Sequence, residues 1–211
     1  MLGEVGDLGM IPDGHDVDAD RQPMTPRRPV KLKEDLKKIQ EAILYVMSLV
    51  SRPTQYDIAK TLFLADRAHL NKYGRPITFD NYVAMEHGPV PSLAYDALKP
   101  GWNYERRFGE ARPWLSSPDP ENARANRYLP KRDPDLRYLS TTDLEELKRA
   151  LGTVQSLSFS QLRRLTHEDP AYAEAWDSRG DNLMNSMLLP LLIERDGEAR
   201  AEDLAYISAR A

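Results

Sequence analysis

Apolar residues recur at intervals of three and four positions in several stretches after residue 30, which is the spacing of one face of an α-helix. The first stripe consists of Leu36, Ile39, Ile43, Val46, Met47 and Val50. It predicts a helix that ends before Pro53, because the residue that precedes a proline resists helical dihedral angles. A second stripe, from Ile58 to Leu70, predicts a helix that stops at Gly74, where glycine supplies the left-handed conformation.

Capping patterns mark where three helices begin. A hydroxyl residue followed three positions later by an acid or an amide satisfies the free N–H groups of a first turn. The pairs of this kind are Thr54 with Asp57, Ser140 with Asp143, and Ser158 with Gln161. Shorter helices are predicted over residues 92–98 and 171–176, and a last apolar helix, started late by Pro190, is predicted over 181–194.

Strand signals are few. Tyr82–Met85 is rich in β-branched and aromatic residues and predicts a short strand. The segment 87–91 is rich in glycine and proline and is predicted to be an ordered turn without an element of its own. Residues 102–135 are predicted to be a long loop that contains a two-stranded β-ribbon. The predicted fold is therefore mainly α with a small β-sheet or β-ribbon (α+β), a compact single-domain helical platform.

Both ends of the chain lack a sustained hydrophobic period. Residues 1–30 hold an acidic cluster that includes Asp13, Asp16, Asp18 and Asp20, and we expect a disordered acidic tail, with an acidic tether for a partner as the alternative. Residues 196–211 are expected to be a polar C-terminal tail. The domain itself is expected to span residues 31–195, without an internal linker.

Composition excludes several classes of protein. The 211 residues include no cysteine, which excludes a disulfide scaffold and a thiolate metal site. The apolar runs are far shorter than the ~20 residues of a membrane span, so we expect no membrane association and a cytoplasmic location. The formal net charge of −4 argues against non-specific nucleic-acid binding, which needs a surplus of Lys and Arg.

Candidate catalytic chemistry is sparse. His69, His87 and His167 with nearby carboxylates are suitable metal ligands, so a metal-dependent hydrolase is one alternative interpretation. Their spacing matches no close-set metal motif, however, and the sequence holds neither a nucleophile elbow nor a phosphate-binding loop. We therefore expect no enzyme activity, no metal and no cofactor.

A second alternative is a winged-helix-like DNA-binding regulator. Eight basic and five acidic residues lie between Arg106 and Arg137, interleaved with aromatic residues. A basic β-ribbon beside a helix pair would place the predicted helix 54–73 near a DNA groove.

Three short motifs stand in a fixed order along the chain. They are Lys72-Tyr73-Gly74-Arg75-Pro76, then Ala84-Met85-Glu86-His87-Gly88-Pro89-Val90-Pro91-Ser92, and finally Leu165-Thr166-His167-Glu168-Asp169-Pro170-Ala171-Tyr172. In this order they resemble the Panacea domain of the SocA-like antitoxins, a phage-associated family. The resemblance covers about residues 35–180, with Tyr172 near the place of the family's usual tryptophan, and residues 100–137 carry no motif of the family.

The resemblance implies an antitoxin that binds and neutralises a cognate protein toxin, and a SocA-like member is also expected to act as a proteolytic adaptor for a Clp-type protease. The two rigid glycine–proline turns would present a preorganised surface to such a partner. The candidate partner-binding residues are Asp66, His69, Tyr73, Arg75, Glu86, His87, Val90 and His167. The alternative is that these turns only close a compact fold.

Overall fold

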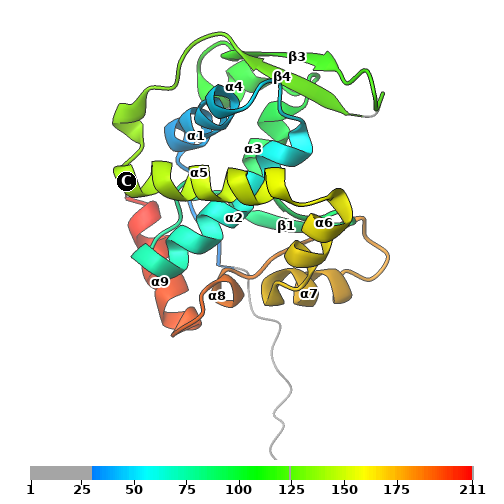
Figure 1. Ribbon diagram of the computed structural model, residues 1–211. Helices are drawn as coiled ribbons and strands as arrows, with labels where there is room; N and C mark the ends of the chain where they lie inside the picture. The colour runs from blue at the N-terminus through cyan, green and yellow to red at the C-terminus, as the bar shows by residue number, and fades with distance from the viewer. Residues whose placement is uncertain (1–29, 124, 211) are drawn as a thin grey trace, which may run out of the picture.

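The computed structural model describes residues 30–123 and 125–210 (Figure 1). It is mainly α-helical with two small antiparallel sheets, as the sequence predicts. The expected acidic tail lies almost entirely outside the described residues. Within them, no helix is both long enough and apolar enough to cross a membrane.

The helices have the following bounds: α1 Leu36–Leu49, α2 Gln55–Tyr73, α3 Ser92–Leu98, α4 Tyr104–Phe108, α5 Thr141–Ser156, α6 Phe159–His167, α7 Pro170–Asp177, α8 Leu189–Leu192 and α9 Gly197–Ser208. The strands are β1 Tyr82–Met85, β2 Gly88–Pro91, β3 Trp114–Pro118, β4 Asn126–Pro130 and β5 Met184–Ser186, and a 3-10 turn covers Leu136–Tyr138. One sheet has the order β2-β1-β5, and the other is the β3-β4 ribbon. The ribbon confirms the prediction for residues 102–135, to which the structure adds α4.

The capping patterns set the helix boundaries. Reciprocal capping boxes begin α2, α5 and α6 at Thr54, Ser140 and Ser158, as predicted. Gly74 ends α2 with a φ of 85°, in the left-handed region. Each of these boundaries depends on side chains within four residues of the helix end, which explains why local sequence was sufficient to predict them.

Helix α2 is the centre of the molecule. In Figure 1, α5 lies across the middle, with α1 and the ribbon on one side and α7, α8 and α9 on the other. Helix α2 packs along α5 and contributes Ile58 and Leu62 to one hydrophobic core and Phe63 and Leu70 to the other. A helix buried in this way cannot enter a DNA groove, which contradicts the winged-helix interpretation.

The segment after His87 is a correction to the sequence prediction, because Gly88–Pro91 forms β2 rather than an irregular turn. Strand β2 lies at an edge of its sheet and pairs antiparallel with β1. Pro89 and Pro91 alternate with Gly88 and Val90, so the positions without an N–H group fall on the side that faces away from β1. Proline is tolerated at such edge positions.

The C-terminal region is a second correction. Residues 184–186 pair with β1 as β5, and only Leu189–Leu192 are helical where a longer helix was predicted. Met187, Leu189, Leu192 and Ile193 are buried together in the second core, although Met187 and Ile193 lie outside the helix. Periodicity does not distinguish a short buried run of this kind from a helix.

The expected polar tail is a third correction, since residues 197–208 form α9. Ala201 and Leu204 on α9 are buried in the second core, and Arg200 Nη2 donates a hydrogen bond to the Leu70 carbonyl oxygen at 3.2 Å. The packed part of the chain therefore extends beyond residue 195.

Candidate functional site

Asp66 is a structural residue inside the fold. It is fully buried, and its carboxylate accepts hydrogen bonds from the N–H groups of Ile77 and Thr78, at 2.8 and 3.1 Å, and from the Thr78 hydroxyl. It also accepts a hydrogen bond from the Tyr82 hydroxyl at 2.8 Å. Burial raises the pKa of Asp66, although these hydrogen bonds act in the opposite direction.

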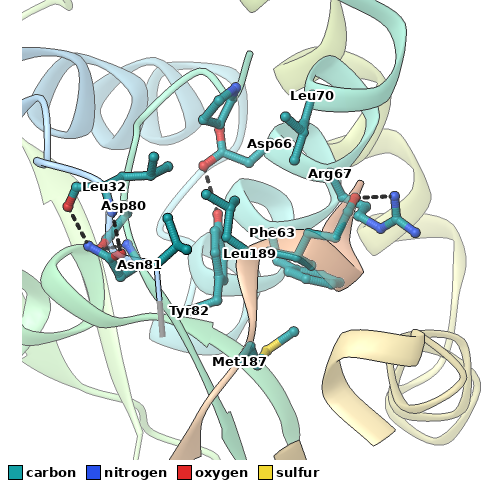
Figure 2. A pocket seen from close by; sticks show the side chains of 13 residues that line it. Leu32, Phe63, Asp66, Arg67, Leu70, Asp80, Asn81, Tyr82, Met187 and Leu189 are labelled. Atoms are coloured by element: carbon teal, nitrogen blue, oxygen red, sulfur yellow. Dashed lines mark hydrogen bonds between the residues drawn. The ribbon is translucent and has the colours of Figure 1, made fainter. Parts of the chain in front are cut away.

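Figure 2 shows Asp66 and Tyr82 turned toward one another in an interior cavity beside Phe63 and Leu189. The cavity volume is about 20 Å³, which is room for about one water molecule. Asp66 therefore fixes the connection between α2 and β1 and is closed to a partner, which corrects its place among the candidate binding residues.

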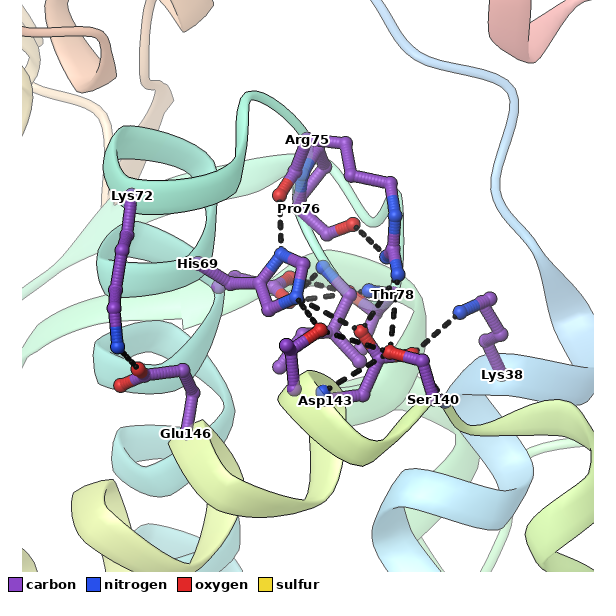
Figure 3. Close-up of polar contacts among 12 residues, drawn as sticks. Lys38, His69, Lys72, Arg75, Pro76, Thr78, Ser140, Asp143 and Glu146 are labelled. Atoms are coloured by element: carbon purple, nitrogen blue, oxygen red, sulfur yellow. Dashed lines mark hydrogen bonds and ion pairs between the residues drawn. The ribbon is translucent and has the colours of Figure 1, made fainter.

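His69 is the second candidate that the fold buries. Its Nδ1 donates to the carbonyl oxygen of Arg75 at 2.7 Å, and its Nε2 lies 3.0 Å from the Thr142 hydroxyl and 3.1 Å from Asp143 Oδ1 (Figure 3). The ring joins the end of α2 to the start of α5. The His69 side chain thus links two helices inside the fold and is not on the surface, which is a further correction.

Asp143 is the central acceptor in this link between α2 and α5. Its buried carboxylate receives Lys38 at 2.7 Å and Arg75 at 2.9 Å, and it also caps α5 by accepting from the Ser140 N–H (Figure 3). Burial acts to raise the pKa of Asp143, but hydrogen bonds from His69 and Lys38 outweigh it and hold the pKa well below its ordinary value. The first glycine–proline turn, Gly74-Arg75-Pro76, is therefore held in place by contacts with buried residues.

Two residues of this first turn still reach solvent. The Tyr73 ring is 38% exposed and lies 4.6 Å from the His69 ring. The Arg75 side chain is 32% exposed while it pairs with Asp143. Their proposed role toward a partner stays a prediction.

The second turn, at Glu86 and His87, is the exposed tip of the β1–β2 hairpin. The His87 ring lies 5.6 Å from the ring of Phe159, which in turn lies 5.1 Å from the ring of Tyr56. We call these three residues the aromatic corner. Phe159 is 52% exposed, and two surface hollows of about 430 and 300 Å³ share Tyr56 and His87 in their walls.

Lys60 lies beneath the aromatic corner and was not among the residues singled out by sequence. Its side chain is 1% exposed, and its Nζ donates to the Pro89 carbonyl oxygen at 2.8 Å and lies 5.3 Å from the centre of the Tyr56 ring. Burial lowers the pKa of Lys60 to about 7. No sequence signal marks Lys60, because the burial of this stretch of α2, with Ala59 and Thr61 on either side, is seen only in the structure.

The end of α6, at His167, lies beside Lys60. Burial, together with the nearby charges of Arg163 and Lys60, lowers the pKa of His167. Its Nε2 and the Tyr56 hydroxyl are both buried without a hydrogen-bond partner among the described residues. We call Tyr56, Lys60 and His167 the Lys60 cluster.

The two turns do not form one continuous surface, which corrects the sequence expectation. Gly88 lies beside Lys60, Thr166 and His167, whereas Gly74 follows the last residue of α2. The 14 positions from Lys60 to Gly74 correspond to about 20 Å of helix. The structure therefore brings together Glu86, His87 and His167 and leaves Tyr73 and Arg75 at the other end of α2. Val90 lines one of the hollows and is 7% exposed, and its role toward a partner stays a prediction.

A comparison with family models matches residues 58–173 to the SocA-like antitoxin family, Panacea domain. The chain belongs to this family. The matched Panacea segment begins inside α2 and ends inside α7, so it contains both turns, Asp143 and His167, and most of the aromatic corner. No curated protein and no solved structure matches the chain.

Metal ligation was the remaining alternative for the histidines. The structure separates His69 from His87 and His167, and within residues 30–123 and 125–210 no three His, Asp or Glu side chains are grouped so that they could hold a metal ion.

A pH-dependent contribution to stability is expected from Lys60. Because its pKa falls to about 7 on folding, the unfolded chain binds a proton above that pH that the folded chain does not, and the free energy of unfolding rises with pH. From about pH 7 to about pH 8.5 this rise amounts to about 1–2 kcal/mol, and Lys60→Met removes it. Urea unfolding at both pH values measures the rise, with Lys99→Met, at a half-exposed lysine, as the matched control. An equal rise in Lys60→Met and in the unchanged chain would contradict the expectation.

Proposed function

We propose that this SocA-like antitoxin neutralises a cognate protein toxin by direct, stoichiometric contact, and that it acts by binding and not by catalysis. The observation that supports this proposal is the aromatic corner, which lies within or next to the family-matched segment and exposes Phe159 and His87 beside two hollows. Aromatic residues, Phe included, are enriched in protein interfaces, and a few large side chains carry most of the binding energy there.

The geometry also favours the second turn over the first as the contact. Arg75 and His69 are engaged by Asp143, so a partner would have to break internal ion pairs to use them. His87 and Phe159 are exposed, and the Phe159 ring lies beside the rings of His87 and Tyr56. A partner can cover them without a change in the fold, which keeps the entropic cost of binding low.

The proposal places the encounter in the cytoplasm, and two routes of neutralisation follow from direct contact. In masking, the complex is the end point. In delivery, the antitoxin acts as a proteolytic adaptor and passes the bound toxin to a Clp-type protease. The half-life of the toxin in cells with and without the protease separates the two routes, because only delivery shortens it.

Co-expression tests the proposal. The chain is produced together with the small protein encoded by the gene next to its own, and growth and co-purification are measured. We expect the small protein alone to arrest growth, the pair to restore it, and the two chains to co-purify in equal amounts. Continued arrest together with no complex would overturn the proposal.

A further inference from the structure

The Lys60 ammonium lacks a counter-charge in the described chain. Its one hydrogen bond goes to the carbonyl oxygen of Pro89, and no described carboxylate forms an ion pair with it. A buried charge without an opposite charge is costly, by several kcal/mol in a low-dielectric site. Lys60 therefore borders the hollow of about 300 Å³, and when it is protonated two of its three donor positions are unused among the described residues.

Two more polar groups next to Lys60 are also unused. The Tyr56 hydroxyl comes from α2, as Lys60 does, and His167 Nε2 comes from the end of α6; neither has a hydrogen-bond partner among the described residues. Buried polar atoms are nearly always paired in proteins, so two orphans beside an uncompensated lysine point to a missing ligand. All three groups can donate a hydrogen bond, which matches an anion and opposes a metal ion.

Glycine at position 88 lets three side chains approach the backbone of β2 closely. A methyl group there would lie 2.6 Å from Lys60 Nζ, 2.7 Å from Thr166 Oγ1 and 3.4 Å from the His167 ring. These three side chains therefore converge on one point beside β2. The aromatic corner stands next to that point, and the hollow of about 300 Å³ includes Tyr56, Lys60 and His87 in its walls.

We propose that the Lys60 cluster is a binding site for a carboxylate group, supplied by an acidic side chain of the bound protein toxin. The source of the carboxylate rests on the proposed function. The ammonium of Lys60 pairs with the carboxylate, and the Tyr56 hydroxyl and His167 Nε2–H donate to its oxygens. A single buried cation suits one carboxylate, whereas a nucleic-acid backbone is neutralised by several exposed Lys and Arg side chains.

The site is tested first on the isolated, full chain. The NMR signals of the His167 ring and of the Lys60 side chain are followed during titration with sodium acetate, with sodium chloride as the ionic-strength control. We expect a saturable shift with acetate that chloride does not reproduce. Lys60→Met weakens acetate binding at least about tenfold, while Lys99→Met, at an exposed lysine, leaves it unchanged. The absence of a saturable shift, or an equal shift in Lys60→Met, would overturn the proposal.

Tyr56→Phe keeps the proposal testable if Lys60→Met fails to fold. This variant removes only an unpaired hydroxyl, so the fold loses no hydrogen bond. We expect acetate affinity to fall about threefold or more, whereas a purely structural role predicts no change. Titration with inorganic phosphate is the second arm, and tighter Lys60-dependent binding of phosphate than of acetate would overturn the assignment to a carboxylate.

The affinity of the chain for the toxin identifies the source of the carboxylate. If Lys60→Met lowers toxin affinity about tenfold, the source is the toxin; if acetate binds but toxin affinity is unchanged in this variant, the assignment to the toxin is wrong. Failure of the proposed function looks different, because the toxin then binds no form of the chain while the acetate shift persists.

Discussion

Replacement of Asp143 with alanine is expected to lower the free energy of unfolding by about 3–5 kcal/mol, measured by urea denaturation at neutral pH. The variant removes the one carboxylate that receives Lys38, Arg75 and His69, and it also removes the cap of α5. Positive charge is then left beside a buried site without an opposite charge. The loss should far exceed that of an ordinary helix cap, which is about 1 kcal/mol.

Glu145→Ala is the matched control, because Glu145 is an exposed carboxylate two residues further along the same helix. It should change the free energy of unfolding by less than about 0.5 kcal/mol. A loss of about 1 kcal/mol for Asp143→Ala would mean that only the helix cap stabilises the fold. The ion pairs that link α1, α2 and α5 through Asp143 would then contribute nothing to the free energy of unfolding.

The pH dependence of Asp143 adds a second readout. Its pKa is lower in the folded chain than in the unfolded chain, so its stabilisation is present above the ordinary carboxyl pKa of about 4 and is lost as the pH falls below that value. Asp143→Asn should therefore lose less stability than the unchanged chain when the pH is lowered through this range.

Replacement of Gly88 with alanine is expected to lower the free energy of unfolding by about 2–4 kcal/mol. Gly88 has a φ of 101°, where a side chain is strained, and the added methyl would lie under 3 Å from Lys60 Nζ and Thr166 Oγ1. Lys60 would have to move away from the Pro89 carbonyl oxygen to relieve the contact, which leaves a buried ammonium without its hydrogen bond. Thermal or urea unfolding measures the loss.

Gly109→Ala separates the two causes of this loss. Gly109 has a φ of 73°, but a methyl group there would meet no atom within 4 Å. The control should show only the backbone strain, about 1 kcal/mol. Equal losses in the two variants would contradict the close packing of Gly88 against Lys60 and α6.

The sequence predicted the elements whose boundaries are local. The capping boxes at Thr54, Ser140 and Ser158 and the glycine stop at Gly74 depend on residues within one helical turn, and the structure confirms each of them. Strand β2 and helix α9 depend on distant parts of the chain instead. Pro89 is tolerated because β2 is an edge strand. Helix α9 packs against the second core through a narrow apolar stripe. The local sequence around each element was therefore not sufficient to predict it.

The candidate site was predictable in part for a similar reason. Sequence identified His87 and His167 through their motifs, and the fold brings them together beside Gly88. It also suggested Asp66 and His69, whose polar side chains are used inside the molecule. Residue type does not reveal which polar groups are buried, because burial is decided by packing between α2 and α5.

Lys60 and Phe159 show the opposite error. A lysine is usually exposed and a phenylalanine usually buried, yet Lys60 is 1% exposed and Phe159 is 52% exposed. The reversal of both preferences at one place is visible only in the structure, and it is the reason that this place carries the functional proposal.

The central claim, that the toxin is bound at the aromatic corner, is tested most directly by calorimetric titration of the purified toxin with chains altered at one exposed aromatic residue. Tyr206 on α9 is the matched control, since it is 58% exposed and α9 lies across the molecule from α6 (Figure 1). We expect Phe159→Ser to bind the toxin at least about tenfold more weakly than the unchanged chain and Tyr206→Ser to bind within about twofold of it. Unchanged affinity in Phe159→Ser, or an equal loss in both variants, would contradict the account.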